Sequence, residues 1–152
     1  MKLLQGVLVA FTGAILMSCQ NEEPAFFDNS LDELQISIMK VEKGVKPKND
    51  NLQFVRFVTD KEKLLLKSFI NSAIVKKRNY VFCEYYLAFK GNGESYVYGI
   101  VYCPDQKSIG IDVTSSNTVG LPISSTHNIL YNENRALSDQ LYKMIFEKGE
   151  LR

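Results

Sequence analysis

The segment from Tyr80 to Cys103 constrains the fold more than any other part of the chain. Tyr80–Phe89 and Tyr96–Cys103 are rich in aromatic and β-branched residues, which favour strands. Gly91-Asn92-Gly93 lies between them, and a sequence of this kind is a strong turn signal. We therefore expect an antiparallel hairpin, and with it an antiparallel sheet.

The register of this hairpin decides which side chains face each other. If the loop runs from Gly91 to Ser95, the facing pairs are Phe89–Val97, Leu87–Gly99, Tyr85–Val101 and Cys83–Cys103. The two cysteines then lie opposite each other on an apolar face, and a one-residue change of register would separate them. Two interpretations stay open, a cross-strand disulfide between Cys83 and Cys103 or two buried thiols.

The same register gathers aromatic side chains on the other face of the hairpin. That face would carry Tyr80, Phe82, Tyr86, Tyr96, Tyr98, Ile100 and Tyr102, together with Glu84 and Lys90. If it is uncovered, Tyr86, Tyr96, Tyr98 and Tyr102 form a candidate binding surface, because tyrosine combines rigid contact area with a polar tip. If a helix or the first pair of strands covers this face, the tyrosines merely suit half-buried strands.

Periodicity places the other elements. Alternating apolar residues predict strands over Leu34–Val41 and Leu52–Val58, and a third strand of a meander follows the hairpin over Ile109–Val113. The capping box Thr59–Glu62 begins one helix, and a second helix is expected from about Asn134 to Lys148. The order ββαβββα predicts an α+β domain with two helices packed on an antiparallel sheet.

Two polar stretches are interpreted from their surroundings. Lys76-Lys77-Arg78 follows the first predicted helix directly. A basic run can bind phosphate, but cations at a helix C-terminus also complement the helix dipole, and we adopt the second interpretation. Thr114–Asn128 is rich in Ser and Thr, and we expect a long connection with at most a short strand.

The chain opens with Met1-Lys2 and an apolar run from Leu3 to Leu16. This run is shorter than the roughly 20 residues of a membrane-spanning helix and matches the core of a signal peptide, about 7–15 residues. Leu16-Met17-Ser18-Cys19 resembles the lipobox of bacterial lipoproteins. In that family the cysteine receives a diacylglycerol, the leader is cut before it, and the new amine is acylated. The resemblance implies that Cys19 is the lipid anchor.

The resemblance also gives the expected organisation of the chain. Residues 1–18 are the signal peptide, residues 19–30 a lipidated flexible tether, and residues 31–152 a single α+β domain. In lipoproteins of the enterobacterial type an aspartate after the cysteine resembles a signal for retention in the inner membrane. This chain has Gln20 there, which favours the outer membrane. The leaflet stays open.

Composition excludes several functions. Without its leader the chain has 17 basic and 17 acidic residues, so it has no general attraction for nucleic acid. His127 is the only histidine, and no thiolate pair has ligand spacing, so neither a metal nor a cofactor is expected. His127 could join Asp112 and Ser124 or Ser125 in a triad. No nucleophile-elbow pattern accompanies them, and we expect no enzyme.

These features favour a non-enzymatic, lipid-anchored envelope protein whose domain binds another protein or an envelope polymer. Two alternatives stay open. One is a periplasmic immunity or inhibitor protein that blocks a toxin or hydrolase, and the other is a structural component of an envelope assembly. Capture of a glycan by the tyrosine-rich face is a further form of binding.

Replacing the anchor cysteine tests the lipobox. Cys19→Ala should give a precursor that no longer incorporates labelled fatty acid, because the acyl chains are attached to this thiol. Metabolic labelling followed by electrophoresis measures this, with Cys103→Ala as a control that should keep its label. Unchanged labelling of Cys19→Ala would show that the motif does not act as a lipobox.

Overall fold

The computed structural model describes residues 31–79, 83–91, 93–103, 108–114 and 126–147. The strands are β1 (Gln35–Lys40), β2 (Gln53–Phe57), β3 (Ile74–Asn79), β4 (Tyr85–Gly91), β5 (Glu94–Cys103), β6 (Ser108–Asp112) and β7 (Thr126–Tyr131). The helices are α1 (Asp60–Asn71) and α2 (Arg135–Tyr142), which continues into a π-helical turn, η4 (Lys143–Glu147). Two short 3₁₀ turns are η1 (Leu31–Glu33) and η2 (Asn49–Asn51).

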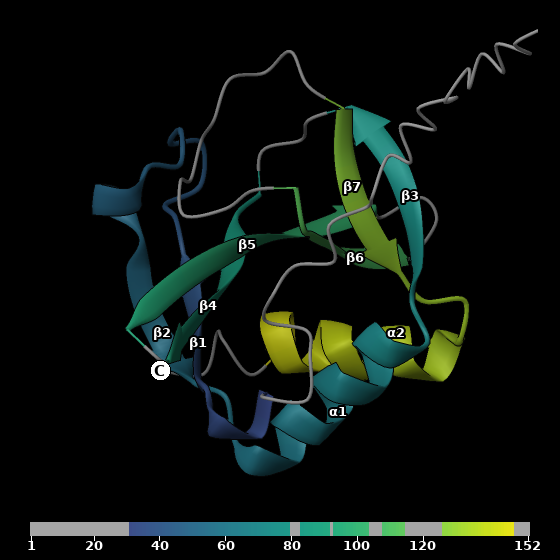
Figure 1. Ribbon diagram of the computed structural model, residues 1–152. Coiled ribbons are helices and arrows are strands. Elements are labelled where there is room, and N and C mark those ends of the chain that lie inside the picture. Colours follow the sequence, from purple (N-terminus) through teal and green to yellow (C-terminus); the bar gives the residue numbers. More distant parts are fainter. Residues whose placement is uncertain (1–30, 80–82, 92, 104–107, 115–125, 148–152) are drawn as a thin grey trace, which may run out of the picture.

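The described strands form one antiparallel sheet in the order β2-β1-β4-β5-β6-β7-β3. Figure 1 shows α1 and α2 together against one face of this sheet. We call this the helix face and the opposite one the outer face. The predicted α+β class, with an antiparallel sheet and two helices, is confirmed. The predicted order ββαβββα is wrong, because the structure adds β3 and β7 and follows ββαβββββα.

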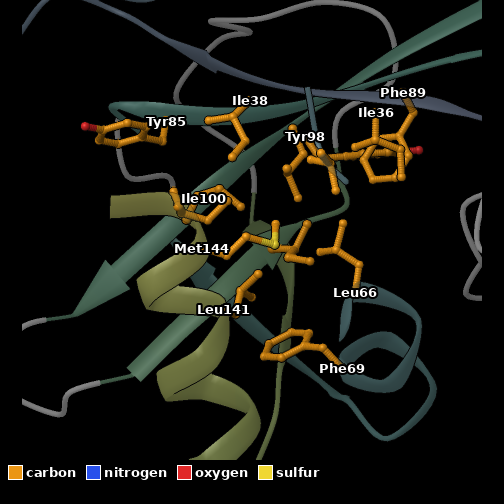
Figure 2. Packing of buried hydrophobic residues seen from close by; sticks show 14 of the residues in the cluster. Ile36, Ile38, Leu66, Phe69, Tyr85, Phe89, Tyr98, Ile100, Leu141 and Met144 are labelled. Carbon is orange, nitrogen blue, oxygen red and sulfur yellow. The ribbon is translucent and has the colours of Figure 1, made fainter. Parts of the chain in front are cut away.

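A continuous apolar core lies between the helices and the sheet. Figure 2 shows Leu66 and Phe69 of α1 and Leu141 of α2 in the same cluster of side chains as Ile38 of β1 and Ile100 of β5. All five side chains are buried. Burying one such side chain contributes about 1.5–3 kcal/mol, so packing on the sheet, more than helix propensity, stabilises the two helices.

The start of α1 follows the predicted capping box. Thr59 Oγ1 accepts a hydrogen bond from Glu62 N, and Glu62 Oε2 accepts one from Thr59 N. The same carboxylate forms a two-pronged ion pair with Arg56 of β2, with N–O distances of 2.8 and 3.1 Å. Arg56 Nη2 also donates to the carbonyl oxygen of Met144 at 2.7 Å. One guanidinium therefore connects β2, α1 and the end of the second helix.

The end of α1 differs from the prediction. The helix stops at Asn71, and the basic run Lys76-Lys77-Arg78 lies in β3, paired with β7. Asn132 donates to the carbonyl oxygen of Phe69 at 2.8 Å and to Ser72 Oγ at 2.7 Å, which satisfies groups at the helix end. The interpretation of the basic run as a helix terminus is therefore wrong. This contact at the helix end comes from a residue 63 positions away, which no local sequence pattern predicts.

The expectation of a connection with at most a short strand over Thr114–Asn128 did not include the strand that begins at its C-terminal end and continues to Tyr131. Thr126–Tyr131 forms β7, which lies between β3 and β6 in the sheet. Of the earlier part, only Thr114 is among the described residues. β7 pairs with two strands, β3 and β6. It therefore depends on non-local contacts, which the Ser- and Thr-rich sequence before it does not predict.

The register of the central hairpin is one residue away from the predicted one. Gly91 pairs with Glu94 and Tyr86 with Gly99, whereas the prediction placed Leu87 opposite Gly99. Gly93 has φ +77°, a conformation that glycine adopts without strain and that tight hairpin turns require. The turn is therefore tighter than the predicted loop from Gly91 to Ser95, and every side chain of β5 changes its partner on β4.

This register places Gly99 under the side chain of Cys83 on the outer face. A methyl group built on Gly99 would lie 2.6 Å from Cys83 Sγ and 3.2 Å from Cys83 Cβ. Contacts this short force the neighbouring side chain or backbone to shift.

Gly99→Ala should therefore lower the free energy of unfolding by about 1–3 kcal/mol. The loss should be smaller in a Cys83→Ala background, because the sulfur is then absent. Urea unfolding of the two single variants and the double variant measures the coupling between the sites. An equal loss in both backgrounds would contradict this packing.

Candidate functional site

The predicted tyrosine surface is absent, because the register separates its members. Tyr98 and Tyr86 are buried on opposite faces, Tyr98 in the helix-face core and Tyr86 on the outer face. Tyr96 and Tyr102 pack against the helix-face core. The ring of Tyr102 lies 4.9 Å from that of Tyr142, next to α2. Tyr96, Tyr98 and Tyr102 therefore lie on the helix face, and among them Tyr102 has ring contacts with the second helix and the turn that continues it.

The two domain cysteines share the outer face but are not bridged in the structure. Both are free, Cys83 buried and Cys103 half-buried. The predicted facing pair is wrong, because the β4–β5 register pairs Tyr86 with Gly99 and is therefore one residue away from the one that would align Cys83 with Cys103. Burial, together with the charge of Asp112, raises the pKa of the Cys83 thiol to about 12. Cys83 is thus a neutral packing group and a poor nucleophile.

A buried histidine and aspartate meet on the outer face. His127 Nδ1 lies 2.6 Å from Asp112 Oδ2, and both side chains are less than one-tenth exposed. Asp112 Oδ1 also accepts a hydrogen bond from the backbone N–H of Thr114 at 3.0 Å. The structure thus brings together two members of the triad considered from the sequence. Ser124 and Ser125 lie outside the described residues. The pair joins β6 to β7 through a buried polar contact, which such groups require.

Arg78 is the central residue of a second polar cluster. The β3–β7 register places Arg78 opposite His127, so its side chain lies on the outer face. Arg78 Nη1 donates to Tyr131 Oη at 2.8 Å and to Cys103 Sγ. Both contacts raise the pKa of Arg78 above its ordinary value, and the contact with Cys103 has the larger effect. Burial raises the pKa of Tyr131, and Arg78 partly opposes this shift. The guanidinium is therefore a fixed, permanent positive charge.

A hollow of about 260 Å³ adjoins this cluster. It is lined by Lys76, Lys77, Arg78, Ser108, Tyr131, Asn132 and Glu133, and we call it the cationic hollow. The ammonium nitrogen of Lys76 lies 5.7 Å from the centre of the Tyr131 ring, within the range of a cation–π contact. Gly110 makes room for that ring, since a Cβ there would lie 2.9 Å from Tyr131 Cε1.

Several described cations form no ion pair with a described carboxylate, and those of the hollow are distinguished by lying consecutively on one strand, β3. Lys40, Arg56, Lys63 and Lys67 each form an ion pair with a carboxylate. No described acid lies within ion-pair distance of Lys76, Lys77 or Arg78, although Glu133 lines the same hollow. Three neighbouring positive charges without such a partner repel one another, and an anion in the hollow would relieve this repulsion.

Other surface features are weaker candidates. A second hollow of about 310 Å³ is lined by Val41–Lys46, Cys83 and Glu84, whose charges are of both signs. Phe54 and Phe57 are exposed and pack edge to face at 4.8 Å on β2, at the opposite edge of the sheet from β3. No cluster of potential metal ligands and no helix able to span a membrane occurs within the described ranges.

No protein family, curated protein or solved structure matched the chain. The evidence for the candidate site is therefore its own geometry. Sequence reasoning singled out Lys76-Lys77-Arg78 but assigned the run to a helix end. The preceding Ile74-Val75, two β-branched residues after Ala73, was the available signal for a strand.

Thiol modification tests the two cysteines. In the folded protein at pH 8, iodoacetamide should modify Cys103 well before Cys83. A rise in pKa from 9.0 to about 12 lowers the thiolate fraction of Cys83 by about three orders of magnitude. Mass spectrometry of timed samples measures both rates, and Cys103→Ser should leave one slow thiol. After denaturation both thiols should react, whereas a complete lack of reaction would contradict the free cysteines.

Proposed function

We propose that the protein is a non-enzymatic, lipid-anchored protein of the cell envelope that binds an anionic envelope polymer in the cationic hollow. The observation that carries this proposal is the set of three cations on one strand beside a common hollow, without a carboxylate within ion-pair distance among the described residues. Opposite charge attracts such a polymer, and the fixed Arg78 gives the contact a defined geometry.

The distribution of apolar surface favours a polymer over a protein partner. The core of a protein interface is usually apolar and contiguous. The large exposed apolar side chains among the described residues are dispersed instead. Val45 lies between β1 and β2, Phe54 and Phe57 on β2, Leu64 on α1, and Ile74 and Val75 at the far edge of the sheet on β3. The charge of β3 is thus a more concentrated recognition feature than any apolar patch.

The anchor and the hollow complement each other in this proposal. Cys19 would hold the domain at the outer membrane, and the tether of residues 19–30 would let the hollow reach a polymer attached to the same envelope. Confinement to the membrane raises the effective concentration of both partners, so even weak binding in the hollow would be sufficient.

A pair of matched variants tests the proposal. Lys76→Ser with Lys77→Ser should weaken binding of the full-length acylated protein to isolated envelope polymer by about tenfold, since two favourable charge contacts are lost. Lys43→Ser with Lys46→Ser removes the same charge from the second hollow and should leave binding unchanged. Co-sedimentation in detergent at low and high salt measures both, and binding to the unmodified protein should fall as salt rises.

Two outcomes would contradict the proposal. If both double variants weaken binding equally, net charge and not the cationic hollow is responsible. If neither variant changes binding, the polymer is bound elsewhere on the chain or not by charge.

A further inference from the structure

We infer that the cationic hollow recognises a phosphoryl group, with Arg78 and Ser108 as the groups that donate hydrogen bonds to its oxygens. This inference rests on the proposed function and specifies the chemical class of its ligand. A phosphorylated glycan and a phosphate-bearing lipid headgroup share this chemistry.

Arg78 is prepared to bind an oxyanion. Arginine has N–H donors on three nitrogens in a planar fork, which matches pairs of phosphate oxygens. The two hydrogen bonds of Arg78 both leave from Nη1, toward Tyr131 and Cys103. Within the described part of the chain, Nε and Nη2 donate to no protein group. The contacts at Nη1 therefore hold the plane of the guanidinium, and the other donors remain available to a ligand.

Ser108 provides an independent indication. Ser108 lines the same hollow. Its Oγ is buried and has no hydrogen-bond partner among the described residues. A buried hydroxyl without a partner costs about 1–3 kcal/mol, so its retention calls for an explanation. A ligand oxygen in the hollow would accept this hydrogen bond. Ser108 lies opposite Cys103 in the β5–β6 register, so it belongs to the same face as the Arg78 contacts.

The charge of the lining selects among anions. Among the lining residues, Lys76, Lys77 and Arg78 carry three positive charges and Glu133 one negative charge, a formal net charge of +2, in which Lys76 and Arg78 share the outer face and the β3–β7 register turns Lys77 toward the helix face. A phosphate monoester carries about −1.5 to −2 at pH 7, and a carboxylate carries only −1. A phosphoryl group therefore neutralises the hollow, whereas a carboxylate leaves it positive. The hydroxyl of Ser108 adds a neutral donor for a third oxygen.

Protection of the sheet edge explains only part of this arrangement. Lysines on an edge strand prevent pairing with other chains, and β3 is such a strand in the described sheet. That role accounts for Lys76 and Lys77. It does not require an arginine fixed by Tyr131, nor a buried hydroxyl on β6, two strands further in.

The test uses the full-length acylated protein in detergent micelles with inorganic phosphate as the probe. Titration followed by ³¹P NMR should show saturable binding with a dissociation constant on the order of 1 mM, as befits a small ion in an open site. Acetate should bind at least tenfold more weakly. Arg78→Lys, which keeps the charge and removes the fork, should weaken phosphate binding about tenfold.

Ser108→Ala gives a second, structurally mild variant. It should weaken phosphate binding severalfold and leave the melting temperature of the unliganded protein unchanged or higher, because an unpartnered buried hydroxyl is removed. Displacement of phosphate by glucose 1-phosphate would identify a glycan-type source, and displacement by detergent-dissolved phosphatidate a headgroup source. Either result supports the inference, and displacement by neither overturns it.

The other outcomes separate this inference from the proposed function. Equal binding of acetate and phosphate, or phosphate binding that is unaffected by both variants, would overturn the inference. Absence of phosphate binding, while polymer binding still depends on Lys76 and Lys77, would overturn the inference and leave the proposed function intact. Phosphate binding without polymer binding would overturn the proposed function and leave the inference intact.

Discussion

The pairing of β4 with β5 is the constraint on which the rest of the structure depends. Because the strands join through a tight turn at Gly93, Tyr86 faces Gly99, and the two faces of the sheet receive different side chains. Tyr98 is directed into the core beneath the helices, while Cys83 occupies the space above Gly99 on the outer face. A slip of one residue would exchange these environments along the whole of β5.

Local interactions were predictable from the sequence, and non-local ones were not. The capping box at Thr59 lies within one turn of helix and was identified correctly, as were the strands around Ile36, Val55 and Ile111. The turn register depends on one residue more or less in the loop, which composition does not determine. β3 and β7 depend on pairing with each other, and β7 also on β6, and apart from Ile74-Val75 the polar pattern of β3 gives little reason to expect a strand.

The candidate site was partly visible for the same reason. Its three cations form a contiguous basic run that the sequence displays, but their meaning depends on partners elsewhere in the chain. Tyr131, which fixes Arg78, lies 53 residues further on, and Ser108 belongs to a strand that β7 separates from β3. His127 and Asp112 were likewise named from the sequence, while their contact follows from the pairing of β6 with β7.

The outer face carries two polar groups with different needs for a partner, the His127–Asp112 pair and the guanidinium of Arg78. His127 and Asp112 are removed from water and satisfy each other, so the pair stabilises the sheet without needing a ligand. Arg78 is held by the side chains of Tyr131 and Cys103, which orient the guanidinium, and no described carboxylate lies within ion-pair distance of it. If Arg78 served only to hold β3 in place, a carboxylate would be a more suitable partner for its guanidinium. The absence of a described carboxylate partner keeps the positive charge available, which is the property that a binding site for anions requires.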